Sequence, residues 1–130
     1  MTIDFTDPNF DDLLDTSMLD TLRDIGGKEL IVELVDEFQK GEASWIESVS
    51  SSAAQGNLIE ARKAAHGLKG SAGQMGARQI AAISHAIENA CIQEEMETVI
   101  SLVDPLRDAF KRTCIALEQE KTKPSSTEES

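Results

Sequence analysis

Apolar residues recur along most of the chain at spacings of three and four, which is the period of an amphipathic helix. From Thr16 this pattern predicts a short helix that ends at Gly26-Gly27, because glycine commonly ends a helix. A longer helix is predicted over about residues 28–51, where it ends in a cluster of serines. The apolar positions of the two helices are Met18, Leu19, Leu22 and Ile25, then Leu30, Ile31, Leu34, Val35, Phe38, Trp45, Ile46 and Val49.

A third helix is predicted to begin after Asn57. Glu60 follows three residues later, which is the spacing of an N-cap with a reciprocal Glu. The apolar stripe then runs from Leu58 to Met75, and Gly76 is the expected end.

Two more helices follow, over about residues 78–92 and from about Glu95 onward. Pro105 should bend or break the last helix, because proline removes a backbone donor and clashes with the preceding turn. No alternating pattern typical of strands competes with these helices. The sequence therefore predicts an all-α fold, an antiparallel up-down four-helix bundle with a short additional N-terminal helix.

The ends of the chain differ from the middle. Residues 1–15 are acidic and lack a sustained period, which predicts an arm before the bundle of residues 16–120. Residues 121–130 are poor in apolar side chains, so a disordered tail is expected. Cys91 and Cys114 lie in apolar helical patterns without metal-ligand spacing, and both are expected to be reduced, buried packing residues.

The chain has 130 residues and a net charge of −12, from 24 acidic and 12 basic side chains. A negative net charge of this size repels nucleic acid and anionic membranes, so neither is an expected partner. No apolar run approaches the roughly 18 residues of a membrane span. The first twenty residues hold six Asp and no Lys or Arg, unlike a secretory signal, so a cytoplasmic protein is expected.

One stretch departs from this acidity, because residues 61–87 contain no acid at all. On a helical wheel His66 falls outside the apolar stripe, with Arg62 one turn before it and Lys69 and Gly70 one turn after it. Cations beside a histidine disfavour the imidazolium form but stabilise a dianionic group attached to the ring. The cations of this stretch are Arg62, Lys63, Lys69 and Arg78.

The same predicted helix contains Gly67, Gly70 and Gly73. Glycine inside a helix costs about 1 kcal/mol relative to alanine, so three within one helix need a reason. Exposed glycines remove the layer of side chains and let another molecule approach the helix closely. Together with the cations around His66, they predict a surface phosphohistidine that a partner approaches.

The run HGLKGSAGQMGA at residues 66–77 resembles the motif of histidine-containing phosphotransfer (Hpt) domains, approximately H-x-L-K-G-S-x-x-x-hydrophobic-G-A. The resemblance extends over about residues 16–118 and includes a following helix that ends in Ile87-Glu88. Two departures are small: Ala72 stands where many members have Ser, and Arg78 adds a cation just after the motif.

The resemblance implies roles for individual residues. The histidine that matches His66 is the phosphoacceptor, the lysine that matches Lys69 steadies the phosphoryl group, and the glycine that matches Gly70 leaves room for an incoming receiver domain. The position 22 residues after the histidine is Glu88 here, which is expected to hydrogen-bond the imidazole. His85 is similar to a second histidine that joins this network in chemotaxis kinases.

Further residues are expected to contact a partner. Gly70, Gly73 and Gln74 follow the histidine, and Leu22 belongs to the short first helix, which in the family leaves apolar surface beside the histidine. Arg62 contacts the phosphate or the partner, or belongs to a solvated charged face. A metal site is not expected, because His66 and His85 are predicted on different helices without ligand spacing to a cysteine or carboxylate.

These observations predict a phosphorelay protein in which His66 accepts a phosphoryl group from a receiver-domain aspartyl phosphate and passes it to another receiver. The chain should be a carrier and not an ATP-dependent kinase, since it has no GxxxxGK[ST] nucleotide loop. The expected partners are response-regulator receivers and a hybrid histidine kinase. No cofactor is expected on this chain, and Mg²⁺ would be held by the receiver. A monomer is expected.

Two alternatives stay open at this point. The chain could be a module that a kinase ATP-binding domain phosphorylates directly, as in chemotaxis kinases, although its start at Met1 and its polar tail favour a stand-alone protein. It could also be an adaptor bundle that only docks and carries no phosphate.

Overall fold

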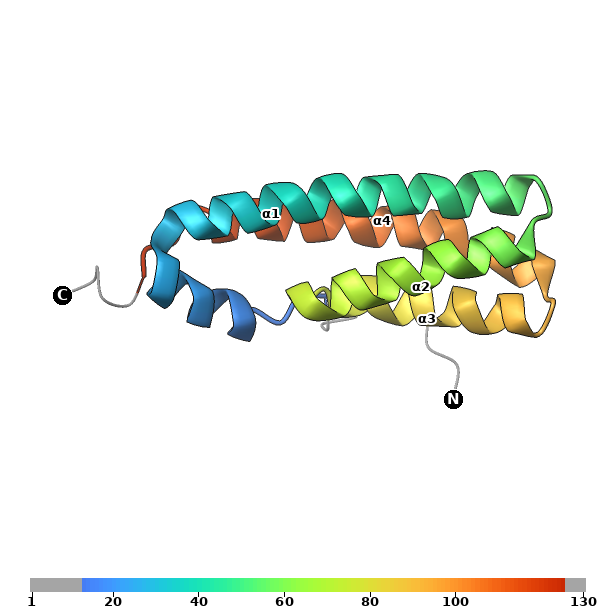
Figure 1. Ribbon diagram of the computed structural model, residues 1–130, viewed down its shortest axis with the longest axis horizontal. Helices are drawn as coiled ribbons and strands as arrows, with labels where there is room; N and C mark the ends of the chain where they lie inside the picture. The colour runs from blue at the N-terminus through green and yellow to red at the C-terminus, as the bar shows by residue number, and fades with distance from the viewer. Residues whose placement is uncertain (1–12, 126–130) are drawn as a thin grey trace.

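The computed structural model describes residues 13–125, which form four helices and contain no strand. The helices are α1 (Ser17–Ala54), α2 (Leu58–Met75), α3 (Arg78–Ile92) and α4 (Met96–Glu120). The chain turns back after each of the first three helices, and the four lie side by side in an elongated bundle (Figure 1). α1 and α3 each contact both α2 and α4. The predicted all-α class is confirmed.

Across residues 13–125, none of the helices combines the length and the apolar character that a membrane crossing requires.

α1 bends sharply at Gly27, whose backbone (φ 71°, ψ −169°) is not helical. Glycine adopts such a positive φ without the steric cost of a Cβ. The first turns of α1, residues 17–26, therefore lie at a steep angle to the rest of the helix (Figure 1). The predicted stop at Gly26-Gly27 corresponds to this bend. The predicted end in the serine cluster is wrong, because α1 continues through the serines to Ala54.

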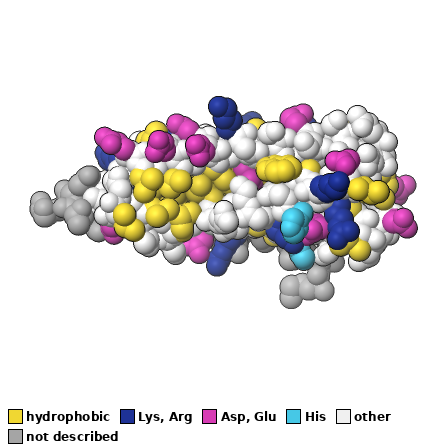
Figure 2. Space-filling model, in the orientation of Figure 1, with side chains coloured by type: hydrophobic (Ala, Val, Ile, Leu, Met, Phe, Trp, Pro, Cys, Tyr) yellow, Lys and Arg dark blue, Asp and Glu magenta, His cyan; other side chains and the backbone are white. Residues whose placement is uncertain are grey.

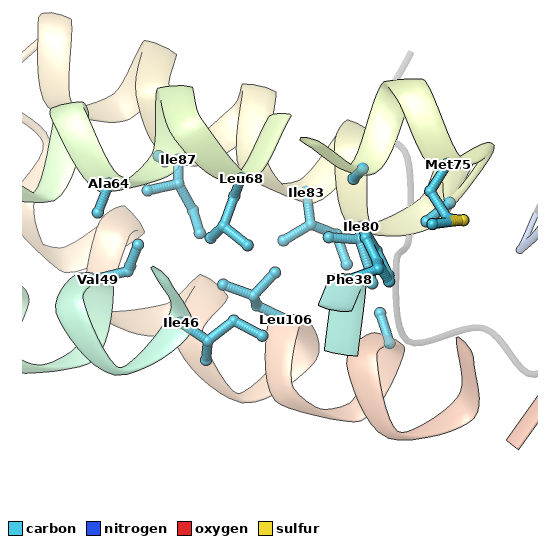
Figure 3. Close-up of a cluster of buried hydrophobic side chains, with 14 of the residues drawn as sticks. Phe38, Ile46, Val49, Ala64, Leu68, Met75, Ile80, Ile83, Ile87 and Leu106 are labelled. Atoms are coloured by element: carbon cyan, nitrogen blue, oxygen red, sulfur yellow. The ribbon is translucent and has the colours of Figure 1, made fainter. Parts of the chain in front are cut away.

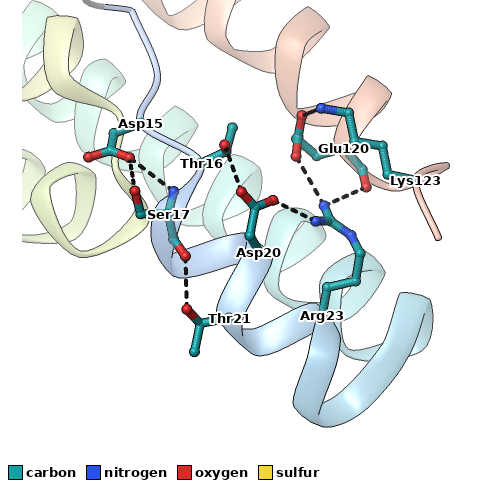
Figure 4. A network of polar contacts seen from close by, with 8 residues as sticks. All are labelled: Asp15, Thr16, Ser17, Asp20, Thr21, Arg23, Glu120 and Lys123. Carbon is teal, nitrogen blue, oxygen red and sulfur yellow. Dashed lines mark hydrogen bonds and ion pairs between the residues drawn. The ribbon is translucent and has the colours of Figure 1, made fainter. Parts of the chain in front are cut away.

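A buried ion pair ties the start of α1 to the end of α4. Arg23 is 4% exposed, and its guanidinium donates to Oε1 and to the backbone oxygen of Glu120, both at 3.0 Å (Figure 4). Asp20 and Lys123 extend the network, at 2.8 Å from Arg23 and 2.5 Å from Glu120. Breaking a buried pair leaves an uncompensated charge, so this contact favours one position of the segment over others.

The core is built from aliphatic side chains of all four helices (Figure 3). Ile46 from α1, Leu68 from α2, Ile83 and Ile87 from α3, and Leu106 from α4 are at most 2% exposed. Full burial of one such side chain stabilises a fold by roughly 1.5–3 kcal/mol. This packing fixes α2 against α3, which is the arrangement that the candidate site requires.

The buried stripe of α1 differs in part from the predicted one. Leu30 and Leu34 are only half-buried and Trp45 is 40% exposed, whereas Glu42 is fully buried. The three apolar residues flank the stripe and do not lie at its centre. The buried positions after the bend are Ile31, Val35, Phe38, Glu42, Ile46, Val49 and Ala53.

The ends of α2 agree with the prediction except in one detail. Oδ1 of Asn57 accepts a hydrogen bond from the backbone N–H of Glu60 at 3.1 Å, which confirms the N-cap. The Glu60 carboxylate does not return the bond, because it pairs with Lys63 at 3.4 Å while the Asn57 N–H donates to the carbonyl of Ser52. α2 ends at Gly76 in the left-handed conformation, with φ 86°.

Of the two outcomes predicted at Pro105, the break is wrong, because α4 is one helix with Pro105 inside it, and the bend stays a prediction. Cys91 is buried as expected, whereas Cys114 is only half-buried, and both thiols are free. Burial raises the pKa of both thiols, so both remain protonated at neutral pH.

Part of each chain end falls within the described residues. The backbone N–H of Asp15, at the end of the predicted arm, donates to the carbonyl of Gly76 at 2.8 Å. Beyond α4, Lys121 forms ion pairs with Asp36 at 2.5 Å and Glu118 at 3.0 Å. The predicted arm before residue 13 and the predicted disorder of residues 126–130 lie outside the described part.

Candidate functional site

His66 lies on the outer face of α2, and its side chain is 70% exposed. The residues around it in the sequence explain this orientation, because Ala61, Ala65, Leu68 and Ala72 form the buried stripe of the same helix. Packing of this stripe against the core turns the histidine toward solvent, as the helical wheel predicted.

Glu88 brings α3 to this histidine. Nδ1 of His66 and Oε2 of Glu88 are 2.8 Å apart, and Nζ of Lys69 donates to Oε1 of the same carboxylate at 2.6 Å. Two groups of α2, an imidazole and an ammonium, thus share one carboxylate of α3, whose side chain is 10% exposed. The expected hydrogen bond between the imidazole and Glu88, in which the carboxylate is the acceptor, is present. The ion pair between Lys69 and Glu88 was not predicted.

The surroundings keep Glu88 ionised. The hydrogen bond from Lys69 lowers the pKa of the Glu88 carboxyl most, burial opposes that shift, and the hydrogen bond from His66 lowers the pKa further. Because an ionised carboxylate only accepts hydrogen bonds, Nδ1 of His66 must carry the proton. The lone pair of the neutral ring is therefore on Nε2, for which the described residues provide no hydrogen-bond partner.

A hollow of about 390 Å³ opens beside the ring. Its walls are Ile59, Arg62, Lys63 and His66 of α2, and Glu88 of α3. Arg62 is exposed and the Lys63 side chain is 70% exposed, so both cations can reach an anion that enters from solvent. The predicted cationic surroundings of His66 are therefore present on this side.

The three glycines of α2 have different surroundings. A Cβ at Gly70 or Gly73 would meet no atom within 4 Å, so the surface there is open. A Cβ at Gly67 would lie 2.8 Å from Cζ2 of Trp45. The expectation that all three glycines admit another molecule is therefore wrong for Gly67, which is small because the indole of α1 packs against it.

A second hollow, of about 400 Å³, lies between the two segments of α1 and the end of α2. It includes Leu22 and Gln74, two of the residues predicted to contact a partner. Figure 2 shows a broad hydrophobic area on the same face as the histidine. The other residues of this hollow are Met18, Leu34, Glu37, Phe38, Ser71 and Met75.

His85 is not joined to the network around His66. It is exposed on α3, and its Nε2 lies 3.3 Å from the side-chain nitrogen of Asn89. In the described range, no hydrogen bond links it to His66 or Glu88. Residues 13–125 also hold no group of three His, Cys, Asp or Glu side chains positioned to bind a metal ion.

One buried acid was missed by the sequence analysis. Glu42 of α1 is 0% exposed, and neither carboxylate oxygen has a hydrogen-bond partner within the described residues. Burial raises the pKa of this carboxyl to about 7. The signal was present in the sequence, since position 42 is four residues from both Phe38 and Ile46.

Comparison with known proteins identifies the class. The model of the Hpt domain family matches residues 29–120, so the chain belongs to this family of histidine-containing phosphotransfer domains. The match begins just after the bend at Gly27, whereas the resemblance in the sequence suggested a start near residue 16. Members of the family are phosphocarriers in phosphorelay signal transduction.

A solved structure similar to this chain is histidine-containing phosphotransfer protein B (HptB) from Pseudomonas aeruginosa PAO1. The two are 25% identical in sequence with a TM-score of 0.76, and the alignment covers 83% of this chain and 93% of that one. The search of curated proteins gave no match. The recognition of an Hpt domain from the motif at residues 66–77 is confirmed.

Proposed function

We propose that His66 is the phosphoacceptor of this chain, taking a phosphoryl group from the aspartyl phosphate of one receiver domain and passing it to the aspartate of another. The observation that carries this proposal is the hydrogen bond of 2.8 Å between Nδ1 of His66 and Glu88, on a side chain that is 70% exposed. It holds the ring with the Nε2 lone pair available to a partner.

The proposed transfer step needs no cofactor bound to this chain. The Nε2 lone pair attacks the phosphorus of the aspartyl phosphate, the bond between phosphorus and the carboxyl oxygen breaks, and the electron pair leaves with the aspartate. The product is an imidazolium that bears a phosphoryl dianion on Nε2 and keeps its proton on Nδ1. Glu88 accepts a hydrogen bond from that proton and stabilises the positive charge that develops on the ring.

Glu88 and Lys69 complete the proposed site, Glu88 by contact with the ring and Lys69 through Glu88. Lys69 keeps Glu88 ionised and aimed at the ring, which favours the reactive tautomer of His66. This arrangement positions the nucleophile in advance, which is the main contribution that a protein makes to phosphoryl transfer.

The receiver would dock on the surface that surrounds His66. Gly70 and Gly73 leave space on α2, and Gln74 and Leu22 border the neighbouring apolar hollow. We propose the antiparallel up-down form of the bundle, with residues 17–26 as an additional N-terminal helix that supplies part of this surface.

The proposal also covers the partners, the oligomeric state and the location of the protein. Mg²⁺ would be held by the receiver, and a hybrid histidine kinase would supply the first receiver. The carrier itself would have no ATP-dependent kinase activity, act as a monomer and work in the cytoplasm. Its strongly negative charge supports the absence of nucleic acid and membrane partners.

A labelling experiment tests this function. The chain is mixed with radiolabelled phosphorylated receivers, and label that is stable in base but labile in acid is followed. His66→Gln should abolish labelling and change the stability of the fold by about 0.5 kcal/mol or less, since the side chain is exposed. His85→Gln is the matched control and should keep the label. Label retained on a folded His66→Gln protein would contradict the proposal.

A further inference from the structure

The cation nearest to His66 in the predicted motif is already neutralised. Nζ of Lys69 lies 2.6 Å from Oε1 of Glu88, while Oε2 of the same carboxylate binds Nδ1 of His66. The charges of Lys69 and Glu88 cancel at this short distance. The pair therefore offers little net positive charge to an anion attached at Nε2, the other nitrogen of the ring.

Arg62 is placed differently. It lies one turn before His66 on α2, and both residues line the hollow beside Glu88. The hollow lies between α2 and Glu88 of α3, so the Arg62 side chain borders the space next to the ring. Within residues 13–125, Arg62 has no ion pair with a carboxylate, and its positive charge is available.

Lys63, the other cation of the hollow, is a weaker candidate. Its Nζ pairs with Glu60 at 3.4 Å, and the side chain is 70% exposed. A guanidinium also presents paired donors in a plane that match the oxygens of a phosphoryl group, which a lysine ammonium does not.

We propose that Arg62 is the counter-charge for the phosphoryl group on His66, and that Lys69 is a positioning residue that acts through Glu88. This inference rests on the proposed function, because it requires a phosphoryl group at Nε2. It divides the work between two cations: one holds the carboxylate that orients the ring, and the other binds the group that the ring carries.

Phosphoramidate tests this assignment without a protein partner. The Nε2 lone pair attacks its phosphorus, the phosphorus–nitrogen bond breaks, and ammonia leaves from the zwitterionic donor, so no further reactant is needed. Wild type, Arg62→Gln, Arg62→Lys and Lys63→Gln are compared for the rate of labelling and the lifetime of phosphorylated His66. Arg107→Gln on α4 is the matched control, because it removes one positive charge from an exposed arginine that does not line the hollow beside His66.

Arg62→Gln should lower the labelling rate or the phosphohistidine lifetime by about tenfold, as expected for a charge-assisted contact. It should also raise the pH at which the phosphoryl group takes up a proton, followed by ³¹P NMR, which a merely structural role would not change. Arg62→Lys should recover part of both effects. Lys63→Gln should have a clearly smaller effect, and Arg107→Gln should match wild type.

The outcomes separate this inference from the proposed function. If the wild-type chain takes no label on His66, the proposed function fails. If it takes label and Arg62→Gln matches Arg107→Gln, only the assignment of Arg62 fails. Equal losses in Arg62→Gln and Lys63→Gln would also overturn it, because they would show a diffuse effect of charge in the hollow.

Discussion

Glu88 and Glu42 are both buried glutamates, but their surroundings shift their pKa values in opposite directions. Glu88 is 8% exposed and receives hydrogen bonds from Lys69 and His66, which lower its pKa. Glu42 is 0% exposed, has no ion pair with a cation of residues 13–125, and has its pKa raised to about 7 by burial. Burial disfavours a charge in both places, and the partners decide whether the carboxyl stays ionised.

The two regions therefore bear on different properties of the protein. At the surface of α2 and α3, an ionised carboxylate holds a histidine and a lysine in fixed positions. In the core, a carboxyl without partners costs stability whenever it is charged. Changes at Glu88 should alter chemistry more than stability, and changes at Glu42 should alter stability more than chemistry.

The largest expected effect is on the pH dependence of folding. The pKa of Glu42 is about 7 in the folded protein against 4.5 for the free side chain, so the folded state binds the proton more tightly. Stability from this group is complete below about pH 4.5 and is lost as the pH rises toward 7. Glu42→Gln should remove this loss and stabilise the protein at pH 8 by up to about 3 kcal/mol.

Denaturant unfolding at pH 5 and pH 8 measures the difference. Glu33→Gln, an exposed substitution on the same helix, is the matched control and should leave the pH dependence of wild type unchanged. An equal pH dependence in Glu42→Gln and wild type would show that Glu42 is not the group that titrates.

How much of this comparison could be predicted from the sequence depends on the residue. The period of three and four located the helices, and the motif at residues 66–77 located His66 together with its family. Glu42 occupies an inward position of α1 but is polar, so the pattern of apolar residues does not predict its burial. Trp45 is apolar but lies beside the stripe, where the absence of a side chain at Gly67 gives it a place to pack.

The site was predictable as a set of residues but not as a set of contacts. The resemblance named Lys69 and Glu88 separately, and periodicity does not fix which side chains on neighbouring helices meet. The Lys69–Glu88 pair depends on how α2 and α3 lie against each other, at 2.6 Å between Nζ and Oε1. For the same reason sequence alone did not decide whether His85 joins the network.

The next largest effect is on the rate of phosphoryl transfer, and it tests the role of Glu88. Glu88→Gln should slow phosphoryl transfer about tenfold, because the amide neither pairs with Lys69 as a charge nor fixes the tautomer of His66. Lys69→Ala should also slow transfer, and Lys69→Arg should keep part of the rate because its charge persists.

Single-turnover rates at saturating phosphorylated receiver give these values, and receiver affinity is measured separately. Because Lys69 acts through Glu88, the double variant that combines Lys69→Ala with Glu88→Gln should transfer no more than slightly more slowly than Glu88→Gln alone. Fully multiplicative losses would show that the two residues act independently.

The smallest effect concerns two glycines of α2, one facing solvent and one facing the indole of α1. Gly70→Ala should stabilise the protein by up to about 1 kcal/mol, since a Cβ there meets nothing within 4 Å and alanine favours helix. Gly67→Ala should gain less or lose stability, because its Cβ would lie 2.8 Å from Trp45. Thermal unfolding measures both, and emission of the single tryptophan should shift only in Gly67→Ala.

A second substitution at Gly70 separates the access of a receiver from the stability of the helix. The larger substitution Gly70→Gln should keep much of the gain in helix stability yet slow transfer from a receiver, because it fills space that a docked partner would use. It should leave labelling by phosphoramidate nearly unchanged, since that donor needs no docking surface. Transfer from the receiver at the wild-type rate would mean that the open surface at Gly70 is not part of the docking site, and the space around His66 would then have to be provided by Gly73 and the apolar hollow beside Gln74.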